Sequence, residues 1–409
     1  MTRDRTWSDV AGVVWPAAHG GGCAIEAVGS PAVAGGEAYE LVRFAGRVRY
    51  VVSDALSPRA RRRVLLYGNR LRAPARRLAR SAVASSYLLR RPRPAARVVA
   101  EADLLHLRGR VARSLRRPEA EVHLTFAVLE RDGAPRPTVL AVDRHGTPLL
   151  FLKLGAGPAR AAALARERDA LDRATRAVPA AVQVPRRRLW LRSGDVTVLG
   201  TEPLRPDVAP VSSADPDATW PALDALVAAN PRCDLALAAS PWLVRLQRVA
   251  EDLRDGPHRD LSLVADAERL RRLVVGYRAR HGAEVLAHGL RHGDWSSWNL
   301  GWAPAWQGRR LTVWDWEYGE QWAPLSLDRH NWFYARATSV RGQAAADAAA
   351  DLLAEARPQR RGEVATGPLT TRLFLLDMAA RRLALAAAGE VGSGRAADEL
   401  LRVLADDLG

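Results

Sequence analysis

Lysine is almost absent from this chain. Of 61 basic residues, 60 are arginine and one, Lys153, is lysine. Lys153 directly follows the apolar run 149–152. Arginine carries a wide planar fork and lysine a compact ammonium, so the exception indicates a position where a guanidinium is unsuitable. An ammonium at the end of a strand is typical of a site that binds nucleotide phosphates. Taken alone, Lys153 is equally well read as a chance surface residue.

Cysteine and long apolar runs are also scarce. Only Cys23 and Cys233 are present, which excludes a disulfide framework and a cysteine-based metal site. No apolar run approaches the roughly 20 residues that span a bilayer. The first residues lack the apolar core of a signal peptide. We therefore expect a globular, cytoplasmic protein, long enough for two or three compact units.

Acidic residues are rare in one part of the chain. Residues 41–117 hold 21 arginines against three acids, a balance of +18, and the rest of the chain carries −2. Such a region can dock on an anionic membrane surface or on nucleic acid. Leucine and valine among the arginines fit a membrane surface better, so nucleic acid is the weaker expectation. A solvated helical face beside a sheet is the alternative.

The pattern of the first half predicts strands and short helices. Residues 1–36 indicate loops and weak strands, 38–44 with 47–52 a hairpin, and 58–89 a helical stretch divided at Pro74. A further helix is expected over 104–115. Residues 121–129, 137–142 and 147–154 predict a three-stranded antiparallel meander. A helix opening at Pro158, strands at 188–191 and 196–199, and a connector at 201–204 follow.

The second half is predicted to be mainly helical. Leu270, Leu273, Val274 and Tyr277 mark an amphipathic helix, and helices are expected near 341–356, 368–388 and 394–407. Loops and two short strands interrupt them at 288–322. The sequence thus predicts an α+β, bilobal architecture. Its expected parts are a basic N-terminal extension (1–118), a strand-rich lobe with the connector (119–206) and a helical lobe (207–409).

Three polar residues suggest a catalytic and metal-binding loop. Asp294 and Asn299 are five residues apart, so one tight loop can present a carboxylate and a carboxamide to the same place. A carboxylate can accept the proton of an attacking hydroxyl. An amide oxygen, together with Asp315 at the end of the next apolar run, suits Mg²⁺, which keeps phosphate and water ligands. Separately, these residues could initiate a turn, cap a helix or end a strand.

Two motifs resemble those of a known family. HGDWSSWN at 292–299 and VWDWE at 313–317 are similar to the signature of aminoglycoside phosphotransferase and choline-kinase-type enzymes, which have the protein-kinase-like fold. The resemblance covers roughly residues 120–390. It implies a catalytic Asp294, magnesium ligands Asn299 and Asp315, and ATP or GTP as the nucleotide. It also implies nucleotide-site roles for Lys153, for Glu167, which orients that lysine, and for the adenine-contacting connector with Glu202 and Leu204.

Some features of the family pattern are weak or open. The segment 130–137 offers only Gly133 where a glycine-rich phosphate loop is expected. His292 is expected to hold the loop, and Glu317 either supports the metal or forms a salt bridge. Eight tryptophans crowd into residues 295–332, where core packing explains most and two or three could contact a substrate.

The function predicted is transfer of the γ-phosphate from ATP to a hydroxyl of a small molecule. A sugar, an aminoglycoside and an amino alcohol are the acceptor classes considered. An aminoglycoside is a polycation and would need acids such as Glu317, Glu320 and Asp328 in its pocket. The alternative is a non-catalytic, kinase-like nucleotide-binding or scaffold protein that docks through its Arg-rich region, a peripheral membrane surface being one such partner.

Overall fold

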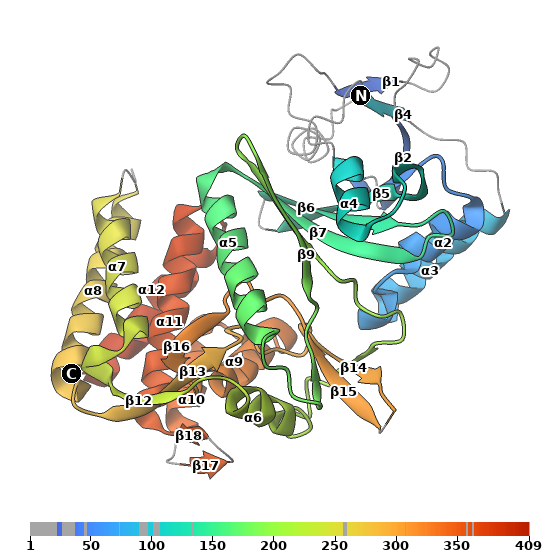
Figure 1. The fold of residues 1–409 in the computed structure, drawn as a ribbon. Coiled ribbons are helices and arrows are strands. Elements are labelled where there is room, and N and C mark those ends of the chain that lie inside the picture. Colours follow the sequence, from blue (N-terminus) through green and yellow to red (C-terminus); the bar gives the residue numbers. More distant parts are fainter. Residues whose placement is uncertain are drawn as a thin grey trace. The chain divides into compact units, whose positions relative to one another are not determined.

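The chain is divided into two compact units. The computed structural model describes residues 23–26, 37–44, 47–72, 74–89, 97–100, 107–131, 134–256, 260–306, 308–356, 359–361 and 364–408. The first unit, here the sheet unit, comprises residues up to 168 and 185–209. The second, here the helical unit, comprises 169–184 and 210–409, so the division falls within one long helix (Figure 1).

An antiparallel sheet of nine strands forms the body of the sheet unit. The strand order is β1-β4-β2-β3-β5-β6-β7-β10-β9. The predicted hairpin and the predicted meander are both present, and β3 pairs directly with β5. Strands on both sides of residue 118 therefore belong to one sheet. The strands are Cys23–Glu26 (β1), Glu37–Phe44 (β2), Arg47–Ser53 (β3), Arg97–Ala100 (β4), His123–Arg131 (β5), Ala134–Val142 (β6), Pro148–Ala156 (β7), Arg187–Ser193 (β9) and Val196–Thr201 (β10).

Helices cover both faces of this sheet. One face packs against Leu107, Val111 and Ala112 of one helix, and the other against two helices that follow β3. Pro74 begins the second of these two, as predicted, because proline suits the first turn of a helix. The helices are Pro58–Leu66 (α2), Pro74–Leu89 (α3), Leu107–Leu115 (α4) and Gly157–Ala174 (α5), with 3₁₀ turns at Asn69–Leu71 (η2) and Glu119–Glu121 (η3).

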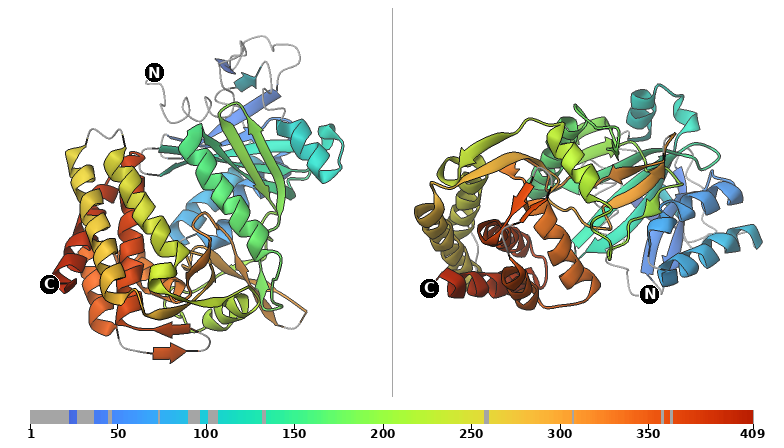
Figure 2. Two further views of the ribbon diagram at one scale, coloured as in Figure 1. Left: turned by 60° about the vertical axis from the view of Figure 1, so that its left-hand side comes forward. Right: turned by 90° about the horizontal axis from the view of Figure 1, so that it is seen from below.

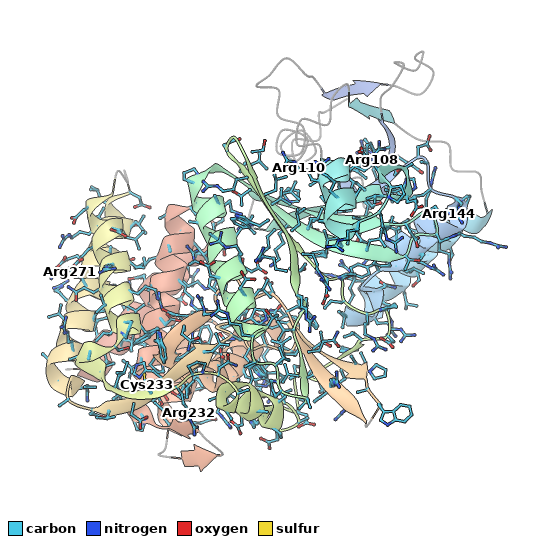
Figure 3. The ribbon with its side chains drawn as sticks, in the orientation of Figure 1. Arg108, Arg110, Arg144, Arg232, Cys233 and Arg271 are labelled. Atoms are coloured by element: carbon cyan, nitrogen blue, oxygen red, sulfur yellow. The ribbon has the colours of Figure 1, made fainter. Side chains whose placement is uncertain are left out.

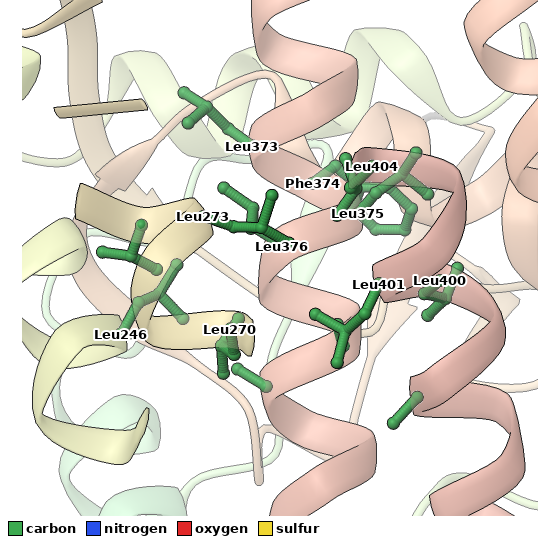
Figure 4. Close-up of a cluster of buried hydrophobic side chains, with 14 of the residues drawn as sticks. Leu246, Leu270, Leu273, Leu373, Phe374, Leu375, Leu376, Leu400, Leu401 and Leu404 are labelled. Carbon is green, nitrogen blue, oxygen red and sulfur yellow. The ribbon is translucent and has the colours of Figure 1, made fainter. Parts of the chain in front are cut away.

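Helices build the core of the helical unit. Leu246, Leu270 and Leu376, from three different helices, lie in one buried cluster (Figure 4). Leu270, Leu273, Val274 and Tyr277 are buried on one helix, as their spacing predicted. The helices are Trp220–Ala228 (α6), Pro241–Asp255 (α7), Leu261–His281 (α8), Leu327–Ala335 (α9), Ala345–Glu355 (α10), Pro368–Ala387 (α11) and Ser393–Leu408 (α12), with a 3₁₀ turn at Leu237–Ala239 (η4) and a π-helical turn at Arg336–Val340 (η5). Figure 2 shows α7, α8, α11 and α12 running beside one another.

The helical unit has more strands than its sequence predicted. Sheets of four strands (β11-β14-β15-β8), three strands (β12-β13-β16) and two strands (β17-β18) accompany the helices. They are short, so their apolar alternation is weak in the sequence. The strands are Val182–Gln183 (β8), Ala209–Pro210 (β11), Cys233–Ala236 (β12), Val285–Arg291 (β13), Leu300–Pro304 (β14), Arg309–Val313 (β15), Glu320–Pro324 (β16), Gln359–Arg361 (β17) and Val364–Thr366 (β18).

The α+β class with an antiparallel-sheet unit and a helical unit is confirmed. Of the predicted helix at 104–115, the part from Leu107 on is α4, and residues 104–106 lie outside the described ranges. The loops predicted for 1–36 also lie outside them, apart from β1. Within the described ranges, no helix has the length and apolar character needed to cross a bilayer.

Candidate active site

The lone lysine forms a buried ion pair in the sheet unit. Nζ of Lys153, on β7, lies 2.7 and 2.8 Å from the two carboxylate oxygens of Glu167 on α5. The glycine two residues after the lysine lets the helix approach, because a Cβ on Gly155 would lie 2.8 Å from Cβ of Arg160. The predicted lysine and glutamate are therefore in contact, in a geometry that directs the ammonium along one face of the sheet.

The connector after β10 is held by side chains of its own unit. Glu202 accepts from the backbone N–H of Arg186 and pairs with the guanidinium of Arg188, with an Nε–Oε1 distance of 3.0 Å. The Leu204 N–H donates to the hydroxyl of Tyr67, at 2.8 Å. The glutamate side chain thus fixes the connector to β9, while the leucine N–H contacts a phenol from the N-terminal region.

The motif 292–299 forms a loop between β13 and β14 of the helical unit. Asn299 Nδ2 donates to Asp294 Oδ2 at 2.8 Å, and Asn331 Nδ2, on α9, donates to Asp294 Oδ1 at 3.2 Å. Two carboxamides therefore fix the orientation of one carboxylate. The contact between Asp294 and Asn299 is the one that their spacing suggested, whereas no sequence pattern pointed to Asn331.

His292 holds this loop, in the role expected for it. Its Nδ1 accepts from the Asp294 backbone N–H (3.2 Å), so its Nε2–H donates to the Trp314 carbonyl (2.9 Å). Gly293 has φ +83°, and a Cβ there would lie 2.2 Å from the Tyr318 carbonyl oxygen. Glycine is thus required between the histidine and the aspartate, because both the left-handed conformation and the close backbone exclude a side chain.

Asp328 lies beneath the loop and not in a substrate pocket. It is only 1% exposed, and its two oxygens accept the backbone N–H groups of His292 and Gly293, both at 2.7 Å. Glu320, also considered as a pocket acid, pairs with Arg245, which in turn contacts the fully buried Asp377. Two of the three acids proposed to recognise a polycation are therefore engaged inside the protein.

Burial perturbs the carboxyl group at the centre of this site. Desolvation raises the pKa of Asp294, and the nearby charge of Asp315 raises it further, while His292 and the two carboxamides oppose the shift. A carboxylate with a raised pKa is a better proton acceptor once it is ionised. The direction of this pKa shift is the one expected for a general base in a partly dehydrated site.

The residues present fit a magnesium ion. The Asn299 amide nitrogen is committed to Asp294, so its oxygen is the atom left to act as a ligand. Asp315 follows β15 with φ 65°, a strained conformation that is concentrated at functional sites. Asp294 and Asp315 repel each other, and a divalent cation would relieve this repulsion. Among the described residues, no group of three or more His, Cys, Asp and Glu side chains could hold a metal ion by itself.

Fewer of the crowded tryptophans are buried than expected, three of the eight. Trp295, Trp316 and Trp332 are buried, and the Trp295 ring N–H donates to Thr219. Trp298, inside the 292–299 loop, is 41% exposed. Gly133 of the weak phosphate loop lies outside the described residues.

No family model and no curated protein matches the chain. Matching solved structures include a thermostable mutant of aminoglycoside phosphotransferase APH(4)-Ia in ternary complex with ADP and hygromycin B, 14% identical, covering 72% of this chain and 97% of that chain, with a TM-score of 0.43. Choline kinase LicA from Streptococcus pneumoniae is 15% identical, with 66% and 89% covered and a TM-score of 0.41. A glucosamine kinase is 16% identical, with 97% and 87% covered and a TM-score of 0.29.

Proposed function

We propose that the chain is a Mg²⁺-dependent phosphotransferase that moves the γ-phosphate of ATP or another triphosphate to a hydroxyl of a small molecule. The observation that carries the proposal is the half-buried carboxylate of Asp294, oriented by Asn299 and Asn331 and placed beside Asp315. Two carboxamides orient this carboxylate and burial raises its pKa. Both features suit the role of a general base better than that of a structural acid.

Each side chain would have a separate task. Lys153, oriented by Glu167, would hold the donor phosphates as a compact cation. Mg²⁺ held by Asn299 and Asp315 would neutralise the charge that develops on the transferring phosphoryl group. Asp294 would accept the proton of the acceptor hydroxyl, whose oxygen forms the new bond to phosphorus. His292 and Asp328 would keep the loop in this geometry.

The test is turnover of Mg·ATP with a panel of sugars, aminoglycosides and amino alcohols, comparing the native protein with Asp294→Asn. Because a general base contributes about 10²–10⁴-fold, the variant is expected to lose that much of kcat. Asp255→Asn, at an exposed position on α7, is the matched control and should keep full activity. Equal turnover by native protein and Asp294→Asn would rule out the proposed base.

The acceptor is proposed to be a neutral sugar or an amino alcohol and not a polycation. Asp328 is buried beneath the loop, and Glu320 is paired with Arg245, so neither is free to bind several ammonium groups. The exposed face of Trp298 suits stacking on a sugar ring or a contact with a single cation. Trp298→Ala should raise KM for the acceptor, whereas Trp306→Ala, at a 98% exposed position, should not.

A second proposal concerns the Arg-rich region, which would attach the protein to an anionic membrane surface. On α3, Arg76 and Arg77 are exposed beside Leu78, whose exposed fraction is 70%. Arg110 projects from α4, on the other face of the sheet, and is a separate basic group (Figure 3). Basic and apolar groups side by side fit a lipid surface. Co-sedimentation with anionic liposomes at low and high salt tests this, and no binding at low salt would exclude it.

A further inference from the structure

The sheet face that carries Lys153 is occupied along its length by the chain's own side chains. Residues two apart on a strand share a face, so Gly155, Lys153 and Phe151 line one face of β7. Gly155 meets α5 and Lys153 meets Glu167. Phe151 packs against the apolar cluster formed with α2 and α3. A donor laid along this face from Lys153 would therefore meet that cluster.

Tyr67 lies where a donor extended along this sheet face from Lys153 would place its base. Thr201, the last residue of β10, pairs with Phe151, and the connector to Leu204 follows. Tyr67, at the C-terminal end of α2, packs against the same apolar cluster as Phe151, and its hydroxyl accepts the Leu204 N–H at 2.8 Å. Leu204 belongs to the connector that the family resemblance implies would contact adenine. A nucleotide base would be held in the same way, with its ring against an apolar strand and one of its polar atoms accepting a hydrogen bond from a connector N–H.

The helix that presents Tyr67 is firmly fixed within the sheet unit. The buried guanidinium of Arg61 pairs with Glu40 of β2 (2.8 Å) and with Asp54 (2.7 Å). The β6–β7 turn packs so closely on α2 that a Cβ on Gly146 would lie 2.5 Å from the Ala60 carbonyl oxygen. Burial raises the pKa of Tyr67 to about 12, so the phenol stays protonated at neutral pH. The contact belongs to the fold and is not made by a loosely attached segment.

We propose that Tyr67 fills the base subsite of the donor site, so that the enzyme selects its phosphoryl donor by the phosphates and not by the base. The donor class is then any nucleoside triphosphate, with inorganic tripolyphosphate as the limiting case. This inference rests on the proposed function, since it takes Lys153 as the phosphate ligand. Transfer from tripolyphosphate breaks its terminal P–O bond, forms the bond to the acceptor oxygen, passes the hydroxyl proton to Asp294 and releases pyrophosphate.

The experiment measures kcat/KM for ATP, GTP, UTP and tripolyphosphate with one acceptor. The native protein is expected to use all four within about tenfold, since a single hydrogen bond contributes about 1 kcal/mol. Tyr67→Ala frees both the space and the Leu204 N–H, so a preference for ATP of about tenfold or more should appear in this variant. Tyr67→Phe keeps the ring in the subsite and should keep the native donor range, as should Tyr50→Phe, which removes a hydroxyl from the same cluster. A native preference for ATP over tripolyphosphate of about 100-fold or more, or an unchanged donor range in Tyr67→Ala, would overturn the proposal.

Binding measurements without turnover separate this inference from the proposed function. Calorimetric titration with adenosine tests the base subsite alone, and Tyr67→Ala is expected to bind adenosine at least about tenfold more tightly than the native protein. Equal adenosine affinity in the two proteins overturns the inference while leaving the phosphotransferase intact. Titration with Mg-tripolyphosphate tests Lys153, and equal binding by native protein and Lys153→Ala contradicts the proposed function and not the role of Tyr67.

Discussion

At the scale of single residues, Asp328 fixes the shape of the 292–299 loop. The Asp328 carboxylate accepts hydrogen bonds from two backbone N–H groups. Asp328→Asn keeps the side-chain volume but replaces one accepting oxygen with an amide N–H₂, which faces one of these donors and cannot accept from it. Hydrogen bonds to charged groups contribute about 1.5–3 kcal/mol, so the free energy of unfolding should fall by that amount, and kcat should fall with it. Urea unfolding and initial rates measure both. Full stability and activity in the variant would show that the loop keeps its shape without this carboxylate.

His330 makes the helical unit sensitive to acid. Burial lowers its pKa to about 4, from about 6.5 in the unfolded chain, and its Nε2 contacts the Thr370 hydroxyl. His330 binds a proton more readily in the unfolded state than in the folded state. Its contribution to the free energy of unfolding is therefore fully present above pH 6.5 and is lost as the pH falls toward 4. The loss should reach about 2 kcal/mol at pH 5 and about 3 kcal/mol by pH 4. Urea midpoints at pH 7.5 and 5 should differ less in His330→Gln than in the native protein, and an equal difference would assign the acid sensitivity to other groups.

At the scale of elements, the β6–β7 turn fixes α2. Gly146 has φ +74° and faces the Ala60 carbonyl, whereas Gly194, with φ +56° in the β9–β10 turn, faces open space. Alanine in the left-handed region costs about 1–2 kcal/mol at either site. Gly146→Ala should cost about 1–3 kcal/mol more than Gly194→Ala, because its methyl group must also displace α2. Denaturant unfolding of both variants measures the difference, and equal losses would mean that the packing of α2 adapts.

At the scale of the whole molecule, the proposed function assigns the donor phosphates to Lys153 and the metal to Asp315, so bound nucleotide should stabilise the chain only when both residues are intact. Mg·ADP at 100 times its Kd should add about 2.7 kcal/mol to the native state. Lys153→Met in the sheet unit and Asp315→Asn in the helical unit should each remove most of the rise in Tm. Differential scanning calorimetry with and without Mg·ADP tests this. A rise that survives either substitution would show that only one of the two units binds the nucleotide.

The sequence alone determined the class of the fold and the content of the 292–299 loop. Pro74, the turn at 193–195 and the spacing of Leu270 to Tyr277 act locally, so the elements around them followed from chain geometry. Asp294 and Asn299 lie within one short loop, which made their contact predictable as well.

Only the tertiary structure decided the partners that come from distant segments. Asn331 and Asp328 contact the 292–299 loop because α9 packs beneath it. Tyr67 contacts Leu204, 137 positions away, because α2 packs on the sheet. The strand pairing that joins β3 to β5 has the same origin. Such contacts depend on how whole elements pack. The sequence does not indicate which distant backbone group will form a hydrogen bond with a given buried polar side chain.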